Sequence, residues 1–199
     1  MNRRRSILLL VTFVAALGAV WLGWKISPLR HQEAAQETSL IGGPFQLVDQ
    51  NGRAVDQGVL KGKWSAVFFG FTYCPDVCPG TLQALNAAAD QLGGEARDFQ
   101  IVFISVDPDR DTPAQVKTYL EGQNLRPGTL GLSGTREQVD AVAKAYRVYY
   151  EKAGEGEDYT VNHTSTVYLM NPRGGFDRPL SYGLTPEQMA EQIEKAMAG

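Results

Sequence analysis

The sequence predicts an α/β sandwich, in which helices cover a central mixed sheet. Apolar runs of strand length alternate along the chain with segments whose apolar residues recur at helical spacing. Two of these runs, 64–72 and 100–106, are apolar almost throughout, as expected of strands buried in the middle of a sheet. The segment 44–199, which contains all these patterns, is long enough for one domain with an adequate core.

The first expected strands, 45–48 and 53–55, flank the dipeptide Asn51-Gly52. Asn-Gly between two short runs is a strong signal for a β-hairpin, because both residues tolerate the positive φ angles of the turn. The next strand, 64–72, is rich in phenylalanine and valine and is bounded by Gly62. We therefore expect an N-terminal hairpin followed by a buried strand.

The middle of the domain is expected to alternate between helix and strand. Segment 81–92 places three leucines and an alanine on one helical face, and it is followed by the expected strand 100–106. A polar loop then leads to a proline that suits the first position of a helix over 113–121. A further helix is expected over 135–146, with two valines and an alanine facing the core.

The C-terminal part is expected to contain strands 148–151 and 164–170, a turn over 171–175 and a returning strand over 176–182. A last helix, 186–198, follows a threonine at its N-cap position and carries Glu and Gln early in its first turn.

An uncharged apolar run over 7–24 follows a cluster of three arginines at the N-terminus. This run matches the roughly 18 to 20 residues that cross a bilayer. Trp21 and Trp24 stand near its end, where aromatic rings favour the headgroup region, and the arginines favour a cytoplasmic N-terminus. The predicted organisation is a cytoplasmic basic tail at 1–6, a single transmembrane signal-anchor at 7–24, a linker at 25–43 and an exported domain at 44–199.

The alternative is a signal peptide cleaved near Gly18 or Ala19, which the continuation of the apolar run disfavours. The short anchor without a transit-like extension favours the bacterial inner membrane, with the domain in the periplasm. The chain's formal net charge is −3, and residues 1–30 carry five positive charges and no acid, so residues 31–199 carry −8. An acidic domain is a poor nucleic-acid binder, which excludes that class.

The two cysteines of the chain stand close together in the sequence Cys74-Pro75-Asp76-Val77-Cys78. A cysteine pair at the end of a central strand, leading into a helix, suggests a thioredoxin-like arrangement. Pro75 disfavours helical geometry at Cys74, and Asp76 is a candidate N-cap. Cys78 would then lie in the first helical turn, where we expect the helix dipole to stabilise its thiolate.

Outside the cytoplasm such a pair is oxidised unless it is reduced or held by a metal. A disulfide across so short a loop removes little chain entropy and would stabilise weakly. Three residues separate the cysteines, whereas dithiol redox sites usually have two. Two thiolates with an imidazole are a ligand set that suits copper, whereas zinc would normally require a fourth ligand.

The chain has two histidines, of which His31 lies in the predicted linker and His163 immediately before the expected strand 164–170. An isolated histidine there is more often a surface or core residue than a ligand. In a thioredoxin-like fold, however, this loop lies against the cysteine pair. Redox thioredoxins place a cis-proline in the loop, but this chain has no proline between Pro127 and Pro172 and offers His163 in about that position.

Three stretches taken together resemble the SCO/SenC copper-chaperone family. They are the cysteine motif with its flanking residues, 70–79, the loop Ser105-Val106-Asp107-Pro108-Asp109-Arg110-Asp111-Thr112-Pro113, and Asn162-His163-Thr164. The cysteine motif is a strong signal, the aspartate loop is strong in combination, and the histidine motif is weak alone. The resemblance runs from about Pro44 to the C-terminus, and the N-terminal anchor also fits it.

The resemblance implies a thioredoxin-like domain tethered to a membrane, with a hairpin insertion between Tyr146 and Thr164. It implies one copper ion, Cu(I) or Cu(II), bound by Cys74, Cys78 and His163. The implied role is to assist assembly of the dinuclear copper centre in cytochrome c oxidase subunit II, by copper transfer, by reduction of the target's cysteines, or both. Other copper or thiol-redox proteins are further implied partners.

Alternative functions remain open from the residues. The cysteine pair could serve a dedicated exported thiol–disulfide oxidoreductase without metal transfer, or a redox or copper sensor. A thiol peroxidase would need an activated cysteine with a nearby threonine and arginine; Thr72 is near in sequence, but no arginine adjoins the motif. Asp107, Asp109 and Asp111 either build the loop or form an acidic rim that engages a partner.

Overall fold

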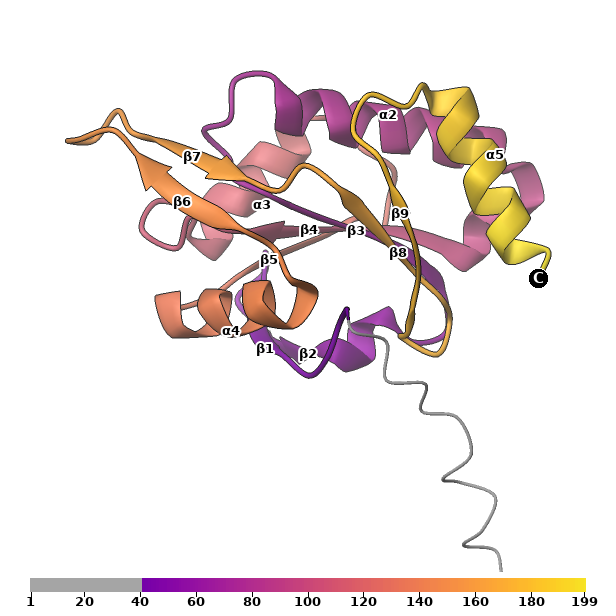
Figure 1. The fold of residues 1–199 in the computed structure, drawn as a ribbon, viewed down its shortest axis with the longest axis horizontal. Helices are drawn as coiled ribbons and strands as arrows, with labels where there is room; N and C mark the ends of the chain where they lie inside the picture. The colour runs from indigo at the N-terminus through magenta and orange to yellow at the C-terminus, as the bar shows by residue number, and fades with distance from the viewer. Residues whose placement is uncertain (1–40) are drawn as a thin grey trace, which may run out of the picture. The chain divides into compact units, whose positions relative to one another are not determined.

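The computed structural model describes residues 41–199 of the chain. These residues form a seven-stranded sheet in the order β2-β1-β5-β4-β3-β8-β9 and a separate two-stranded sheet, β6-β7. Figure 1 shows α2 and α5 side by side over one face of the large sheet and α4 against the other. The predicted α/β sandwich with a central mixed sheet flanked by helices is therefore confirmed, and it fits a thioredoxin-like fold.

The predicted N-terminal hairpin is present. Strands β1 (Gln46–Asp49) and β2 (Ala54–Asp56) pair antiparallel, with Leu47 opposite Val55. Gly52 in the turn has a φ of +81°, a conformation that glycine adopts without steric cost. The hairpin lies at one edge of the large sheet, at the end away from β9.

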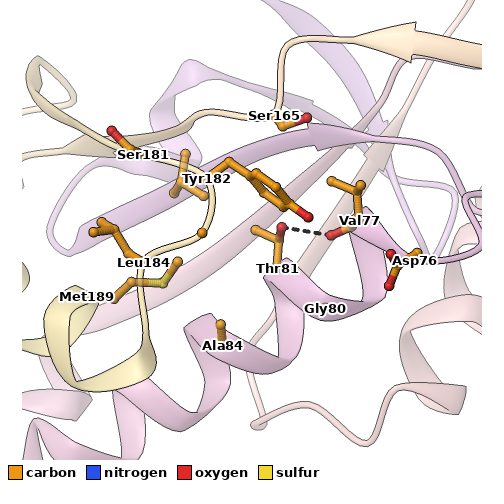
Figure 2. Close-up of a pocket in the computed structure, with 12 residues that line it drawn as sticks. Asp76, Val77, Gly80, Thr81, Ala84, Ser165, Ser181, Tyr182, Leu184 and Met189 are labelled. Carbon is orange, nitrogen blue, oxygen red and sulfur yellow. Dashed lines mark hydrogen bonds between the residues drawn. The ribbon is translucent and has the colours of Figure 1, made fainter.

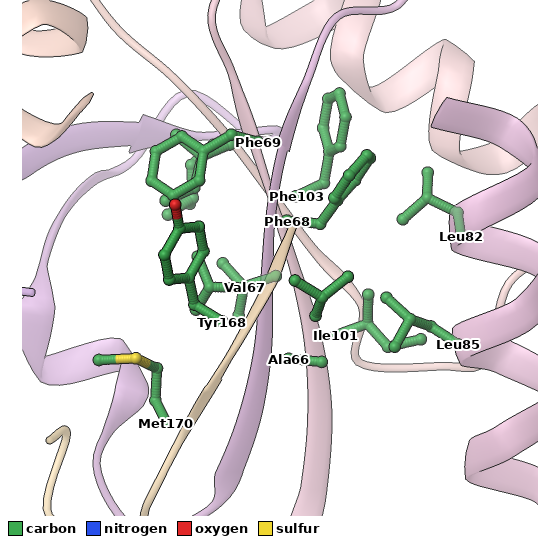
Figure 3. Close-up of a cluster of buried hydrophobic side chains, with 14 of the residues drawn as sticks. Ala66, Val67, Phe68, Phe69, Leu82, Leu85, Ile101, Phe103, Tyr168 and Met170 are labelled. Atoms are coloured by element: carbon green, nitrogen blue, oxygen red, sulfur yellow. The ribbon is translucent and has the colours of Figure 1, made fainter. Parts of the chain in front are cut away.

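Two central parallel strands, β3 (Trp64–Gly70) and β4 (Phe99–Ser105), run side by side with Phe68 opposite Phe103. Strand β8 (Val167–Met170) lies antiparallel on the other side of β3. Because side chains alternate along a strand, the apolar run fills the core on both faces. Figure 3 shows Phe68 on the α2 side of the sheet and Phe69 on the side of Tyr168.

The four predicted helices are present and begin at residues that explain their starts. Thr112 and Thr135 each accept a hydrogen bond from a main-chain N–H in the first turn of the following helix, as does Thr185 at the last helix. Asp76 occupies the N-cap position of α2, but its side chain makes no capping hydrogen bond. The helices are α2 (Val77–Gln91), α3 (Pro113–Gly122), α4 (Arg136–Tyr146) and α5 (Pro186–Met197).

Two strands were not expected from the sequence. Strand β5 (Leu130–Ser133) lies between β1 and β4, and it is too short to leave a pattern. Strand β7 (Thr160–His163) pairs with β6 (Tyr150–Ala153) in the hairpin inserted before β8, so the expected strand 148–151 lies two residues further on. Both hairpin strands carry mainly polar side chains, because they lie outside the large sheet and bury little apolar surface.

The remaining elements follow the predictions closely. Strand β9 (Phe176–Leu180) returns beside β8 after a turn in which Asn171 and Gly175 are hydrogen-bonded. Within residues 41–199, no helix is both long enough and apolar enough to cross a membrane. The predicted transmembrane segment 7–24 lies outside the described residues.

Candidate metal centre

Cys74, Cys78 and His163 meet at the end of β3, although the histidine is 85 positions from Cys78. Their ligand atoms, the two Sγ atoms and a ring nitrogen, all lie within 4.8 Å of one another. The Cys78 Sγ is 3.6 Å from the Nε2 of His163. Among residues 41–199 this is the one group of three or more such side chains close enough to share an ion. The structure thus brings together the three residues that the sequence analysis named as ligands.

The cysteines are positioned by the turn between β3 and α2. The Cys74 N–H donates to the Phe71 carbonyl, and Cys78 lies in the first turn of α2, where its side chain is fully buried. Gly70 at the end of β3 makes room for it: a Cβ at that position would lie 2.7 Å from the Cys78 Sγ and 2.9 Å from the Phe103 ring. The absence of a side chain at residue 70 therefore lets the sulfur approach the strand.

His163 ends β7 and presents one ring nitrogen to the sulfurs. Its Nδ1 lies 3.0 Å from the carbonyl oxygen of Thr164, which assigns the ring proton to Nδ1 and leaves the Nε2 lone pair facing Cys78. The rings of Phe68 and Phe71 meet the imidazole edge to face, at centroid distances of 6.1 and 5.8 Å. These aromatic walls exclude water from one side of the site.

The pKa values of the two cysteines are shifted in opposite directions. The hydrogen bond from the Cys78 thiol is the main cause that lowers the pKa of Cys74, to about 4, and the main-chain N–H groups of Cys78 and Asp76 add to it. The main-chain N–H of Cys78 donates to the Cys74 Sγ at 3.3 Å. The same contact with Cys74, together with burial, raises the pKa of Cys78 far above its usual range. These opposite shifts favour the thiolate at Cys74 and the protonated thiol at Cys78.

This assignment corrects the expectation that Cys78 would be the thiolate stabilised by the helix. Cys74 precedes α2, so the free N–H groups at the start of the helix point at its sulfur. Cys78 lies inside the first turn, where its own side chain faces the core and loses solvation.

We expect iodoacetamide to alkylate Cys74 of the reduced, metal-free chain well before Cys78. Between pH 5 and pH 8 the rate at Cys74 should hardly change, because its thiolate is already formed, and it should fall as the pH drops toward about 4. Mass spectrometry of quenched samples would identify the modified residue. Preferential labelling of Cys78, or a rate that rises steeply from pH 7 to pH 9, would contradict the assignment.

The aspartate loop between β4 and α3 anchors the cysteine turn from beneath. Asp111 is buried and accepts three hydrogen bonds, from the Thr72 N–H at 2.9 Å, the Thr72 hydroxyl at 2.7 Å and the Ser105 hydroxyl at 2.6 Å. Burial raises its pKa above the ordinary carboxyl value. Asp111 therefore ties the residues before Cys74 to the end of β4.

Arg110 links the same loop to the hairpin that carries His163. Its Nε donates to Asp107 at 2.6 Å, and its Nη1 donates to the main-chain carbonyls of Glu157 and Tyr159. The guanidinium also stacks on the Tyr159 ring at 3.5 Å and on the Tyr73 ring at 4.6 Å. The Tyr159 hydroxyl donates to Asp107. Arg110, Asp107 and Tyr159 together form a clamp between the aspartate loop and the hairpin.

These contacts decide between the two readings of the aspartates. Asp107 and Asp111 are buried and bonded within the domain, so they build the loop and cannot form an exposed rim; Asp109 is half-exposed and pairs with Arg136. An arginine does lie beside the cysteine turn in space, which sequence adjacency did not reveal. The sequence analysis gave loop-building as one role of these aspartates but missed the connection from Arg110 to the hairpin, because Tyr159 gave no signal of its own.

The donor set is chemically suited to a soft ion. Two sulfurs and one imidazole nitrogen form a three-donor site that matches Cu(I), and the described residues bring no fourth His, Cys, Asp or Glu to it, as structural zinc would need. Neither cysteine is in a disulfide in this structure, and their proximity also permits a reversible one. The arrangement can therefore hold a soft metal or exchange two electrons.

Comparisons with known proteins agree on one family. The SCO1/SenC family model matches residues 33–198. The human mitochondrial SCO2 homologue is 36% identical over 204 residues, covering 98% of this chain and 76% of its own. The copper-bound crystal structure of Arabidopsis thaliana ScoI matches with a TM-score of 0.75 and 40% identity, covering 79% of this chain and 98% of the other. Copper-bound Bradyrhizobium japonicum ScoI matches with a TM-score of 0.71 and 45% identity, covering 78% and 98%.

Proposed function

The chain belongs to the SCO1/SenC family, and we propose that it is a copper metallochaperone that assists assembly of the dinuclear copper centre of cytochrome c oxidase subunit II. The observation that carries the proposal is the convergence of Cys74, Cys78 and His163 on one point at the end of β3. Copper-bound structures of two similar proteins support copper as the cargo. The soft donor set supports the same choice on chemical grounds.

Transfer proceeds by ligand exchange. Three donors leave copper coordinatively open, so an incoming thiolate of the acceptor can bind while one bond to this chain weakens. His163 is the natural first ligand to leave, because it stands on a hairpin outside the large sheet, whereas Cys78 is buried in α2. Copper then passes through mixed intermediates without release of a free ion.

We further propose that segment 7–24 anchors the chain in the bacterial inner membrane, with tail 1–6 in the cytoplasm. Linker 25–43 would then hold domain 44–199 in the periplasm. The support is the uncharged apolar run, the preceding arginines and the acidic character of the remainder. An exported, membrane-proximal domain would meet the copper domain of the oxidase on the same side of the membrane.

A second candidate is a dedicated thiol–disulfide oxidoreductase that reduces the acceptor's cysteines before copper enters. The low pKa of Cys74 favours this function, because a thiolate is the nucleophile in thiol–disulfide exchange. The buried thiol of Cys78 would then attack the mixed disulfide, releasing the reduced target and leaving a Cys74–Cys78 disulfide. One chain could perform both steps in succession.

The deciding experiment loads the reduced chain anaerobically with Cu(I), removes free metal and mixes the product with the reduced, metal-free copper domain of subunit II. We expect about one copper per chain, which then moves to the acceptor. Loss of all copper on desalting, with a reversible disulfide still present, would contradict the metallochaperone and leave the reductase. Full retention of copper in the presence of the acceptor would contradict transfer.

A further inference from the structure

A groove lies between the first turns of α2, the helix that carries Cys78, and the loop that joins β9 to α5. Its volume is about 150 Å³. The residues that matter to its shape are Asp76, Val77, Gly80, Ser165, Tyr182 and Leu184. Figure 2 shows the Tyr182 ring crossing the groove toward Val77, with Ser165 on the opposite side from α2.

Two residues that line the groove are close neighbours of metal ligands in the sequence. Val77 precedes the ligand Cys78, and Ser165 follows His163 by two residues. Any protein that takes copper by ligand exchange must bring a sulfur into bonding distance of the metal, so its chain must pass over this edge of the domain. The chain on either side of that sulfur then comes within reach of the groove.

Main-chain groups beside the groove are free to pair with such a chain. Ser165 and Thr166 lie between β7 and β8, and neither makes a main-chain hydrogen bond to any other residue in the range 41–199. Both are only partly buried. An extended segment can add to unpaired main-chain groups of this kind by β-augmentation, which supplies affinity without demanding a particular sequence.

Among residues 41–199, the exposed large apolar side chains are Tyr73 (54%), Tyr149 (60%) and Tyr182 (60%). Two of the three, Tyr73 and Tyr182, belong to segments next to the metal ligands or the groove. Tyr73 precedes Cys74, and Tyr182 walls the groove. Tyrosine is enriched at the energetic centres of protein interfaces, because its large rigid ring loses little conformational entropy on binding.

We propose that this groove docks an extended segment of the copper-accepting protein, next to that protein's metal-binding thiolates. The segment pairs with the main chain at Ser165 and Thr166 and inserts one small uncharged or aromatic side chain between α2 and Tyr182. A volume of about 150 Å³ accepts a group the size of benzene. Asp76 is exposed at the rim, and an acidic side chain of the partner would meet repulsion there. The proposal rests on the proposed function, because it is the metal-exchange partner that must occupy this edge.

The groove can be filled without touching the metal ligands. Gly80 lies on α2 and lines the groove, and a Cβ there would meet no atom within 4 Å. Gly80→Leu should therefore occupy the groove while leaving the fold intact, since leucine also favours the helix more than glycine does. Tyr182→Ala removes the outer wall instead. Tyr149→Ala is the matched control, because Tyr149 has the same exposed fraction and lies outside the groove.

The test uses the full chain in mild detergent, loaded with Cu(I), and the reduced, metal-free copper domain of subunit II as the probe. Isothermal titration measures association, and copper analysis after separation measures transfer. We expect Gly80→Leu and Tyr182→Ala to bind the probe about tenfold more weakly or worse. We expect Tyr149→Ala to match the native chain, and all four proteins to release copper equally to a small Cu(I) chelator.

Native affinity in both groove variants, or no measurable association of the native chain, would overturn the proposal. If Gly80→Leu fails to hold copper, Tyr182→Ala decides alone. Weakened association in the variants, with no copper transfer from the native chain, would retain the groove as a docking site and would contradict the transfer function. Loss of transfer with unchanged association would contradict the groove.

Discussion

Replacing Cys78 by serine is expected to reduce the copper retained after desalting from about one per chain to almost none. Cys78 supplies the buried sulfur of the site, and serine offers a hard, protonated oxygen in its place. Cys74→Ser should have the same effect. His163→Ala leaves both sulfurs, so copper should bind about tenfold more weakly or worse without being lost entirely.

Anaerobic competition with a Cu(I) chelator would measure these affinities in the full chain. His31→Ala in the full chain is the matched control, since His31 is the other histidine of the chain and lies outside the described residues. Cu(I) must displace the proton held by Cys78, whereas Cys74 is already ionised above its pKa of about 4. Proton release on binding makes the affinity of the native chain rise with pH. Native affinity in Cys78→Ser, or affinity that falls as pH rises, would refute the assignment.

Asp111→Ala is expected to lower the free energy of unfolding by about 3–5 kcal/mol, because it removes the acceptor of three hydrogen bonds, one from the buried Ser105 hydroxyl and two from the part-buried Thr72. Asp111→Asn should cost much less. Burial already raises the carboxyl pKa, so the site gains little from the negative charge, and the amide oxygen can still accept from Thr72 and Ser105.

The same raised pKa fixes the sign of the pH dependence. A carboxyl with a higher pKa in the folded state stabilises the fold when protonated, so its contribution is lost as the pH rises through the folded value. Asp111→Asn should remove that dependence. Urea denaturation followed by circular dichroism would measure both effects, with Asp109→Ala as the exposed control. Equal destabilisation by alanine and asparagine would show that the charge itself is required.

The sequence predicted the large sheet well because its central strands are buried on both faces. The apolar run that became β3 and the capped helix α5 each carry a strong local signal. Strand β5 was not predicted, because its four residues include a glycine and show no alternation of apolar and polar side chains. Its place between β1 and β4 is set by long-range pairing. Strand β7 was not predicted, because its residues are mainly polar; it pairs with β6 alone, outside the large sheet.

The sequence predicted which residues form the candidate site, but not which of the two cysteines has the lower pKa. The cysteine spacing and the histidine motif named three residues that lie together in the structure, and their role as copper ligands stays a prediction. The sequence could not show that the N–H groups of α2 point at Cys74, because that depends on the path of the turn between Gly70 and Val77. Nor could it show the clamp from Arg110 to the hairpin, which joins residues 49 positions apart.

The β6-β7 hairpin lies outside the large sheet and acts as an arm that holds the His163 imidazole next to the two sulfurs. While the arm is folded, His163 is presented to the sulfurs at an effective concentration that free imidazole in solution would not match. When the arm opens, that advantage disappears, although the seven-stranded sheet stays intact, since peripheral elements open at a lower free energy than the core. Under the proposed function, the residence time of copper is therefore set by a local folding equilibrium. The hydrogen bonds of Arg110 and Tyr159 hold the hairpin to the aspartate loop, so their strength sets how often the arm opens.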